Sequence, residues 1–177
     1  MKRPSRRDRR APEPSPAAFA LRPAGEADRA FCRALYLASV EPLLRALGAW
    51  DAAQAEANFS AYFAPVEIRI VVRDGSPIGY VQVSETKDAL HLDQIHLDEA
   101  YRGRGIGGAL IRRTIEGAAR RGKPLLLEMI RGNRALSLYE RLGFAHAGGD
   151  RTKLRLRLVP GAAEGSSRPE PPDGRRR

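Results

Sequence analysis

The sequence has little cysteine, histidine or aromatic content: its 177 residues include one Cys and three His, and aromatic residues make up 6%. A single cysteine, Cys32, excludes an internal disulfide and a metal site built from several thiolates. The three histidines lack the paired spacing of a zinc site. We therefore expect no metal cofactor, and we expect Cys32 to be a small buried hydrophobe in a reducing, cytoplasmic compartment.

Long apolar runs are absent as well. No stretch approaches the roughly 18 apolar residues that a membrane-spanning helix requires, and no apolar signal-peptide core follows the basic N-terminus. The sequence also lacks the Gly-x-Ser-x-Gly elbow of serine hydrolases and the Gly-Lys-[Ser/Thr] of a P-loop. We therefore expect no membrane partner and no acyl-serine chemistry.

The net charge of +10 is spread unevenly, with +4 on residues 1–16 and +1 on residues 160–177. Both segments are rich in Arg and Pro and poor in apolar side chains, so they cannot bury enough surface to fold. We expect a disordered basic N-terminal arm (1–16), one folded domain (17–159) and a disordered C-terminal tail (160–177). Solvated arms explain this charge more simply than nucleic-acid binding, which is the alternative.

Between these ends, hydrophobic periodicity predicts an α/β fold with a mixed sheet. Apolar patterns predict strands at 19–21, 66–73, 78–83, 89–98, 125–130, 144–147 and 152–158. Helical spacing predicts helices from Glu26, over 51–62 and 105–121, and from a cap at Asn133, and Pro42 is expected to break or bend the first. The strand, helix and strand from 89 to 130 predict one right-handed parallel crossover between hairpins.

The strand over 89–98 changes phase. Its apolar side chains occupy even positions at Leu90 and Leu92 but odd positions at Ile95 and Leu97. A strand of period 2 cannot switch faces without an extra residue, so we predict a β-bulge at 93–95. Bulges re-aim side chains and are common next to active sites. The alternative, a strand buried on both faces, is disfavoured by its interspersed polar side chains.

A glycine-rich turn follows that strand, with its glycines and two arginines at Arg102, Gly103, Arg104, Gly105, Gly107 and Gly108. Glycine permits positive φ and lets a ligand approach the backbone. The helix that opens here presents unpaired N–H groups, which bind phosphate, and arginine adds bidentate cationic donors. The turn therefore predicts a pyrophosphate cradle; the alternative is a tight turn that needs glycine only for packing.

Two segments resemble the GNAT superfamily of N-acetyltransferases. Residues 102–107, Arg-Gly-Arg-Gly-Ile-Gly, are similar to the family signature [Gln/Arg]-x-x-Gly-x-[Gly/Ala]. Residues 133–144, Asn-Arg-Ala-Leu-Ser-Leu-Tyr-Glu-Arg-Leu-Gly-Phe, are similar to its Asn-x-Ala-x-x-Leu-Tyr-x-x-Leu-Gly-Phe segment. The resemblance, which covers about residues 17–158, implies a mostly antiparallel sheet of about six to seven strands. A central parallel pair would be splayed at the bulge, with about four helices around the sheet.

The resemblance implies acetyl-coenzyme A as the donor. Its pyrophosphate would lie on the amides of the glycine-rich turn, and its pantetheine arm would pair with the backbone of the bulged strand. Asn133 would hydrogen-bond the arm. The residues thus expected to bind the cofactor are Ile95, Leu97, Arg102, Gly103, Arg104, Gly105, Ile106, Gly107, Gly108 and Asn133.

The resemblance also places Tyr139 near the sulfur, where it would protonate the departing thiolate; the alternative is a tyrosine that only packs its ring. The acceptor amine must lose a proton before it attacks. His91 and Asp93 on the bulged strand are equal candidates for the base, and His96 and Glu67 are further ones.

The sequence thus predicts an N-acetyltransferase that moves an acetyl group directly to a primary amine of a small molecule or of a protein. A coenzyme A-binding module without catalysis is the alternative. Tyr139 and Asn133 favour the enzyme, because a pure binder needs no phenol beside the sulfur. Neither the identity of the acceptor nor the oligomeric state, a homodimer included, follows from the residues.

Overall fold

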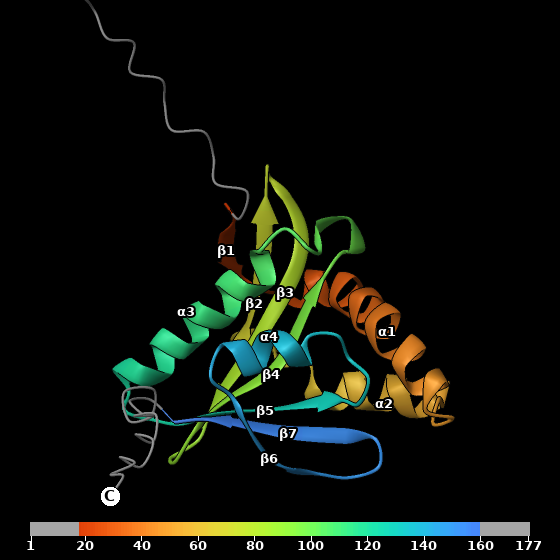
Figure 1. Ribbon diagram of the computed structural model, residues 1–177. Helices are drawn as coiled ribbons and strands as arrows, with labels where there is room; N and C mark the ends of the chain where they lie inside the picture. Colours follow the sequence, from red (N-terminus) through yellow and green to blue (C-terminus); the bar gives the residue numbers. More distant parts are fainter. Residues whose placement is uncertain (1–17, 160–177) are drawn as a thin grey trace, which may run out of the picture.

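The computed structural model describes residues 18–159 of the chain, and the arms predicted at 1–16 and 160–177 lie outside the described residues. Seven strands form one sheet in the order β1-β2-β3-β4-β5-β7-β6, with helices on both faces (Figure 1). The strands are β1 (Ala20–Pro23), β2 (Ile68–Arg73), β3 (Ser76–Glu85), β4 (Leu90–Leu97), β5 (Leu125–Ile130), β6 (Ala145–Gly149) and β7 (Lys153–Leu158). The helices are α1 (Arg29–Ala46), α2 (Ala52–Tyr62), α3 (Ile106–Arg120) and α4 (Leu136–Arg141), with 3-10 turns η1 (Glu26–Asp28), η2 (Pro65–Glu67) and η3 (Glu99–Tyr101). Over this range, no helix combines the length and the apolar character that crossing a membrane demands.

The sheet is antiparallel except between β4 and β5. That parallel pair covers only three residue pairs, from Leu90 opposite Leu125 to Leu92 opposite Leu127. Beyond them the strands diverge, and Figure 1 shows β5, β7 and β6 running in a different direction from β1 to β4. The predicted mixed sheet, with one splayed parallel pair and about four helices, is confirmed.

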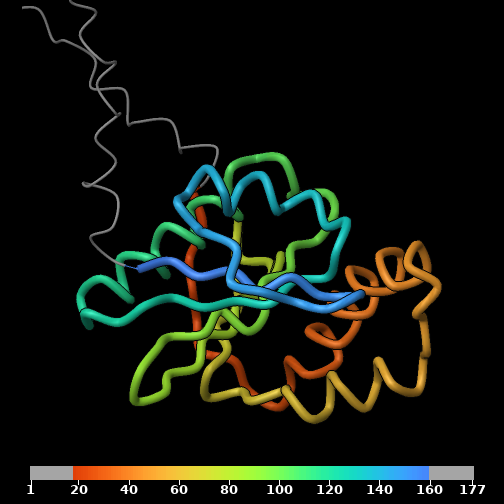
Figure 2. Tube along the Cα trace, turned by 60° about the horizontal axis from the view of Figure 1, so that its bottom comes forward, coloured from red at the N-terminus to blue at the C-terminus, as the bar shows by residue number. Residues whose placement is uncertain are grey.

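Hydrophobic cores lie on both faces of the sheet. Figure 2 shows α2, in yellow-orange, on the opposite side of the strands from α4. The larger core joins α3 and α4 to the sheet, and the smaller one packs α1 and α2 against β2 and β3. Cys32 is fully buried in the smaller core, as predicted, beside Phe59 and Tyr80. Burial raises the pKa of its thiol to about 12, so it stays a thiol at neutral pH.

The bounds of some elements differ from the prediction. Of the break or bend expected at Pro42, the break does not occur, because α1 continues through Pro42 to Ala46. Proline removes one helical N–H donor, but the helix is already held against its neighbours by buried Leu35 and Val40, which precede Pro42. Strand β2 begins at Ile68 rather than two residues earlier, because residues 65–67 form the turn η2.

Candidate functional site

Asp93 is the extra residue of a β-bulge in β4. Two neighbouring residues of β3 lie opposite Gln94 and Leu92, so Asp93 between them has no partner in the register. Its carboxylate Oδ2 accepts a hydrogen bond from the backbone N–H of Ser84 in β3, at 2.9 Å. The bulge predicted at 93–95 is confirmed, and the side chain of its extra residue satisfies a backbone donor of the neighbouring strand.

Beyond the bulge, the backbone groups of alternate β4 residues face away from β3. The N–H of Asp98, directly after β4, faces β3 and donates to the carbonyl of Ile78 at 2.9 Å. Because the backbone groups of successive strand residues point to opposite edges, those of Ile95 and Leu97 face the side that β5 has left. This open edge is where a pantetheine arm was predicted to pair.

The glycine-rich turn holds Gly103 and Gly105 in left-handed backbone conformations, with φ of 72° and 81°. A side chain at either position would be strained. Gly105 caps α3, and its carbonyl accepts the N–H of Ala109 at 3.0 Å. The N–H groups of residues 106–108 therefore have no acceptor within the helix, and they lie at the positive end of its dipole. Such an arrangement binds phosphate.

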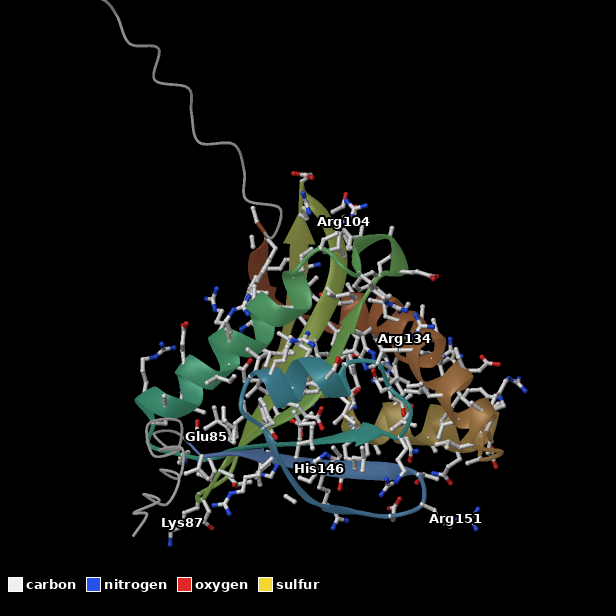
Figure 3. All side chains as sticks on the ribbon, viewed as in Figure 1. Glu85, Lys87, Arg104, Arg134, His146 and Arg151 are labelled. Atoms are coloured by element: carbon white, nitrogen blue, oxygen red, sulfur yellow. The ribbon has the colours of Figure 1, made fainter. Side chains whose placement is uncertain are left out.

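Two arginines flank this turn. Arg102 Nε donates to the Leu97 carbonyl at 3.0 Å, and the guanidinium carbon of Arg104 lies 5.6 Å from the centre of the Tyr101 ring. In the part of the chain that the structure describes, neither arginine is ion-paired with a carboxylate. Figure 3 shows Arg104 at the end of the molecule that carries the turn. Both cations therefore add positive charge beside the amides that were predicted to bind the pyrophosphate.

Asn133 lies before α4 and closes a turn of its own. Its Oδ1 accepts the N–H of Ala135 at 2.9 Å, and its carbonyl accepts the N–H of Leu136, the first residue of α4, at 3.2 Å. The prediction that this helix starts directly after an Asn133 cap was therefore wrong, because α4 begins at Leu136. The side chain satisfies a backbone donor two residues on, and this local turn delays the helix.

Tyr139 lies on α4 in the larger core, the same core against which Ile95 and Leu97 pack. Its side chain is 5% exposed, and its ring meets that of Phe144 edge-on, with centroids 5.4 Å apart. Burial raises the pKa of the phenol to about 12. The ring thus packs, as a structural role requires, and the hydroxyl also keeps its proton at neutral pH, as a donor requires.

The two histidines of β4 lie in different surroundings. His91 is half-buried in the short parallel stretch, two residues before the bulged Asp93. The His96 ring packs against those of Tyr80 and Tyr36, with centroids 5.2 Å and 5.8 Å away. Burial lowers the pKa of His96 to about 4, so this imidazole is neutral at pH 7 and a weak base.

A buried polar group between α2 and the sheet was not predicted. Gln82 is 4% exposed, and its Nε2 donates to the Tyr62 carbonyl at 2.8 Å and to Glu67 Oε2 at 3.1 Å. The Tyr80 hydroxyl is buried with no hydrogen-bond partner among residues 18–159. A small hollow here is lined by Phe59, Tyr62, Phe63, Tyr80, Gln82 and Gln94. Gln82 is a polar residue at an inward position of an alternating strand, which is a signal that the sequence carries.

Nine of the ten residues predicted to bind the cofactor follow one another from the open edge of β4, beyond the bulge at Asp93, into the turn at 102–108. The tenth, Asn133, lies before α4, and Tyr139 of α4 packs in the larger core with Ile95 and Leu97. His96 and Glu67 lie instead on the face covered by α1 and α2. No cluster of three or more His, Cys, Asp or Glu side chains suited to a metal occurs between residues 18 and 159.

Part of this chain is similar to known acetyltransferases. Residues 65–146 match the family model of the acetyltransferase (GNAT) domain. An uncharacterized N-acetyltransferase of Methanocaldococcus jannaschii is 35% identical over 80 residues, which cover 40% of this chain and 35% of that protein. The chain therefore spans about a third of the length of this relative.

Solved structures share the fold over most of the described chain. The PaiA N-acetyltransferase of Thermoplasma acidophilum, in complex with coenzyme A, has a TM-score of 0.65 and 15% identity, covering 80% of this chain and 99% of its own. The ribosomal-protein-S18-alanine N-acetyltransferase of Escherichia coli has a TM-score of 0.59 and 19% identity, covering 84% and 98%. At these identities the likeness shows a common fold.

Proposed function

We propose that this chain, whose residues 65–146 match the GNAT acetyltransferase domain, is a member of that family and an acetyl-coenzyme A-dependent N-acetyltransferase. It transfers the acetyl group from the thioester directly to a primary amine, without an acyl-enzyme. The observation that carries the proposal is the continuity between the β4 edge freed at Asp93 and the phosphate-binding turn capped by Gly105. An extended ligand with an anionic end fits both features at once.

The donor lies along this path. Its pantetheine arm pairs with the backbone of Ile95 and Leu97, as an added strand would. Its pyrophosphate lies on the amides of residues 103–108, with Arg102 and Arg104 as cationic partners. The side-chain amide of Asn133 donates to the arm from the turn before α4. The coenzyme A complex of the Thermoplasma neighbour supports this choice of donor.

The transfer needs three groups around the thioester. A neutral amine attacks the carbonyl carbon, and backbone N–H groups beside the bulge stabilise the oxygen as it gains charge. The carbon–sulfur bond then breaks, and Tyr139 donates the proton of its hydroxyl to the departing thiolate. The proton lost by the amine, carried through the base and solvent, restores the phenol. Because the pKa of its phenol is raised to about 12, Tyr139 is protonated before each turnover and can act as the general acid.

The base is assigned to Asp93 or His91, the two candidates next to the opening between β4 and β5. Asp93 already binds the Ser84 amide through Oδ2, which fixes its carboxylate at the bulge. His91 lies two residues earlier, in the short parallel stretch between β4 and β5. The pH dependence of the rate separates the two.

The acceptor approaches from the face covered by α1 and α2, because the donor occupies the face of α3 and α4. Aromatic side chains of Phe59, Tyr62 and Phe63 border that face, with Tyr62 59% exposed. They suit an amine with an apolar or aromatic body, on a small molecule or on a protein.

Two measurements test the proposed function. Acetyl-coenzyme A at about a hundred times its Kd should stabilise the full-length protein by about 2.7 kcal/mol and raise its melting temperature accordingly. Release of free thiol is then followed over a panel of amines and of peptides with free N-termini. Binding without thiol release from any acceptor supports the non-catalytic module instead. Absence of binding overturns the proposed function.

A further inference from the structure

The two parts of the described chain on either side of residue 102 differ in charge. Residues 18–101, which include α1, α2 and strands β1 to β4, hold 12 Asp and Glu against seven Lys and Arg. Residues 102–159 hold four Asp and Glu against 14 Lys and Arg. The part that contains α1 and α2, from whose face the acceptor would approach, is therefore acidic and attracts cations.

Glu67, the last residue of η2, is held beside the small hollow between α2 and the sheet. Buried Gln82, which lines this hollow, donates through Nε2 to Glu67 Oε2 at 3.1 Å and to the Tyr62 carbonyl at 2.8 Å. The other carboxylate oxygen of Glu67, Oε1, accepts no hydrogen bond from residues 18–159. The carboxylate is thus fixed in place through one oxygen and offers the second to a ligand.

No cation of the described chain neutralises this carboxylate. Glu67 is half-buried, and it forms no ion pair with any Lys, Arg or His between residues 18 and 159. Lys153 is paired with Glu128 at 3.0 Å, and Arg29 packs over the Phe63 ring, with its guanidinium carbon 4.9 Å from the ring centre. Because withdrawing an unpaired charge from water is costly, a cationic ligand would stabilise Glu67.

The hollow beside Glu67 has room for one small polar group. Its volume is about 10 Å³, which a single water-sized group fills. Tyr80, which also lines it, is 1% exposed, and its hydroxyl has no hydrogen-bond partner within the described residues. The rings of Phe59, Tyr62 and Phe63 border the same space, and aromatic faces attract cations. An ammonium group suits this place, because it is about as large as a water and carries only donors.

We propose that Glu67 selects acceptors that carry a second cationic group, remote from the amine that is acetylated. This inference rests on the proposed function. Ile68, which follows Glu67, lies opposite Gln82 in β3. Gln82 in turn lies opposite Gln94 in β4, next to the bulge. Two strand spacings of about 4.8 Å therefore separate Glu67 from β4, so the two cations of the acceptor lie roughly 10 Å apart, on a diamine or on a basic peptide.

Asp74 provides a matched control. It follows the last residue of β2, whereas Glu67 precedes the first, and its side chain is 92% exposed. Its φ of 50° is a conformation that Asn also tolerates. Asp74→Asn therefore removes one negative charge from the same acidic part of the chain and leaves the hollow untouched.

The experiment follows thiol release by the full chain with three acceptors of graded structure. Diaminooctane carries two cations, aminooctanol replaces one of them by a hydroxyl, and diaminoethane brings the two close together. We expect kcat/KM for diaminooctane to exceed that for each of the others by roughly tenfold to a hundredfold, the range for a charged hydrogen bond. Glu67→Gln should remove the preference over aminooctanol by raising KM for diaminooctane, with kcat unchanged. Asp74→Asn should keep it, and melting temperatures check that both variants are folded.

A peptide arm distinguishes the two sources of the second cation. Peptides with a free N-terminus that carry either Lys or its neutral counterpart norleucine replace the diamines. A preference for Lys that depends on Glu67 and appears only among peptides identifies a protein acceptor. A preference confined to diaminooctane identifies a small molecule.

The other outcomes overturn the inference. If neither diaminooctane nor the Lys peptide is preferred to its neutral counterpart, the hollow holds only a water. If diaminoethane reacts as well as diaminooctane, no remote cation site exists. If Glu67→Gln lowers kcat for every acceptor, Glu67 acts on the reacting amine instead. If Asp74→Asn has the same effect as Glu67→Gln, general charge accounts for the preference.

Failure of the proposed function is distinguished by calorimetry, which needs no turnover. Diaminooctane and aminooctanol are titrated into the coenzyme A-loaded protein and into its Glu67→Gln variant. Tighter binding of diaminooctane that depends on Glu67, without thiol release from any acceptor, supports the cation site and contradicts the proposed function. Thiol release without such a difference in binding contradicts the cation site alone.

Discussion

The carboxylate of Asp93 accepts a hydrogen bond from the backbone N–H of Ser84, across the strand pair that carries the bulge. The residue that has no partner in the register thus binds its neighbouring strand through its side chain. This bond fixes both the shape of the bulge and the direction of a carboxylate at the proposed transfer site. Asp93 thus combines a structural role with a proposed catalytic role, and two substitutions separate them.

Asp93→Ala should lower the free energy of unfolding by roughly 1–3 kcal/mol, because it leaves the half-buried Ser84 amide without an acceptor. Asp93→Asn keeps a side-chain oxygen there and should cost less. Urea unfolding of both variants measures the difference. If the two variants were equally destabilised, the hydrogen bond would not be what stabilises the bulge.

The same Asp93→Asn variant tests the base, because it retains the hydrogen bond and loses the proton acceptor. If Asp93 is the base, the variant should lose the acidic limb of the pH–rate profile, and His91→Ala should keep it. The reverse pattern assigns the base to His91. Retention of the acidic limb in both variants would exclude both residues.

Tyr139→Phe should slow acetyl transfer by about a hundredfold or more, the contribution of a positioned general acid. The edge-on contact with Phe144 is kept, so the melting temperature should change little. Single-turnover measurement with saturating acetyl-coenzyme A reports the chemical step. An unchanged rate would leave Tyr139 with a packing role only.

Gly105→Ala should destabilise the protein by about 1–2 kcal/mol, because φ at this position is 81°. It should also weaken coenzyme A binding, since Gly105 sets the direction of the amides that follow. Gly107→Ala is the control for stability: φ is not positive there, and the new methyl group would lie 3.8 Å from Leu97 Cδ1, an ordinary contact. Thermal unfolding compares the two, and equal losses would contradict the strain argument.

Acid should destabilise the protein through His96. Its pKa in the folded protein is about 4, below the ordinary value of 6.5, so the unfolded chain takes up a proton first as the pH falls. The contribution of neutral His96 to the free energy of unfolding is fully present above about pH 6.5 and is lost progressively toward pH 4. By pH 4.5 the loss amounts to roughly 2.5 kcal/mol. His96→Phe removes the titration while keeping an aromatic ring between Tyr36 and Tyr80. The difference between urea unfolding at pH 7.5 and at pH 4.5 should therefore be smaller in the variant; equal differences would refute the role of His96.

The sequence was sufficient to predict features that depend on local pattern. The change of phase between Leu92 and Ile95 predicted the bulge, because the period of a strand is fixed by its backbone. The spacing of glycines predicted the turn, since positive φ at Gly103 and Gly105 strongly favours that residue. The order of strands and helices then predicted a mixed sheet with one parallel pair.

Features that depend on contacts distant in sequence could not be predicted. The bond between Asp93 and Ser84 requires the register of two strands, which the pattern of each strand alone does not give. Helix α1 continues through Pro42 to Ala46 although proline favours a local break, and the apolar pattern of the segment does not reveal this. The late start of α4 depends on the local turn in which the Asn133 side chain accepts the N–H of Ala135. The sequence alone does not distinguish this turn from a helix that begins at Asn133.

The hydrogen bond from Arg102 to the Leu97 carbonyl has a consequence for how a long ligand enters. One side chain covers part of the strand edge and also belongs to the phosphate-binding turn. If the proposed function holds, an anion that draws Arg102 away should uncover the carbonyl, and we expect the two ends of the ligand to bind with positive cooperativity. A short pantetheine thioester has no phosphate to draw Arg102 away from the Leu97 carbonyl. We therefore expect it to bind more weakly than its own contacts with the β4 edge would predict. We therefore expect the hydrogen bond of Arg102 to favour ligands that carry both the pantetheine arm and the phosphates.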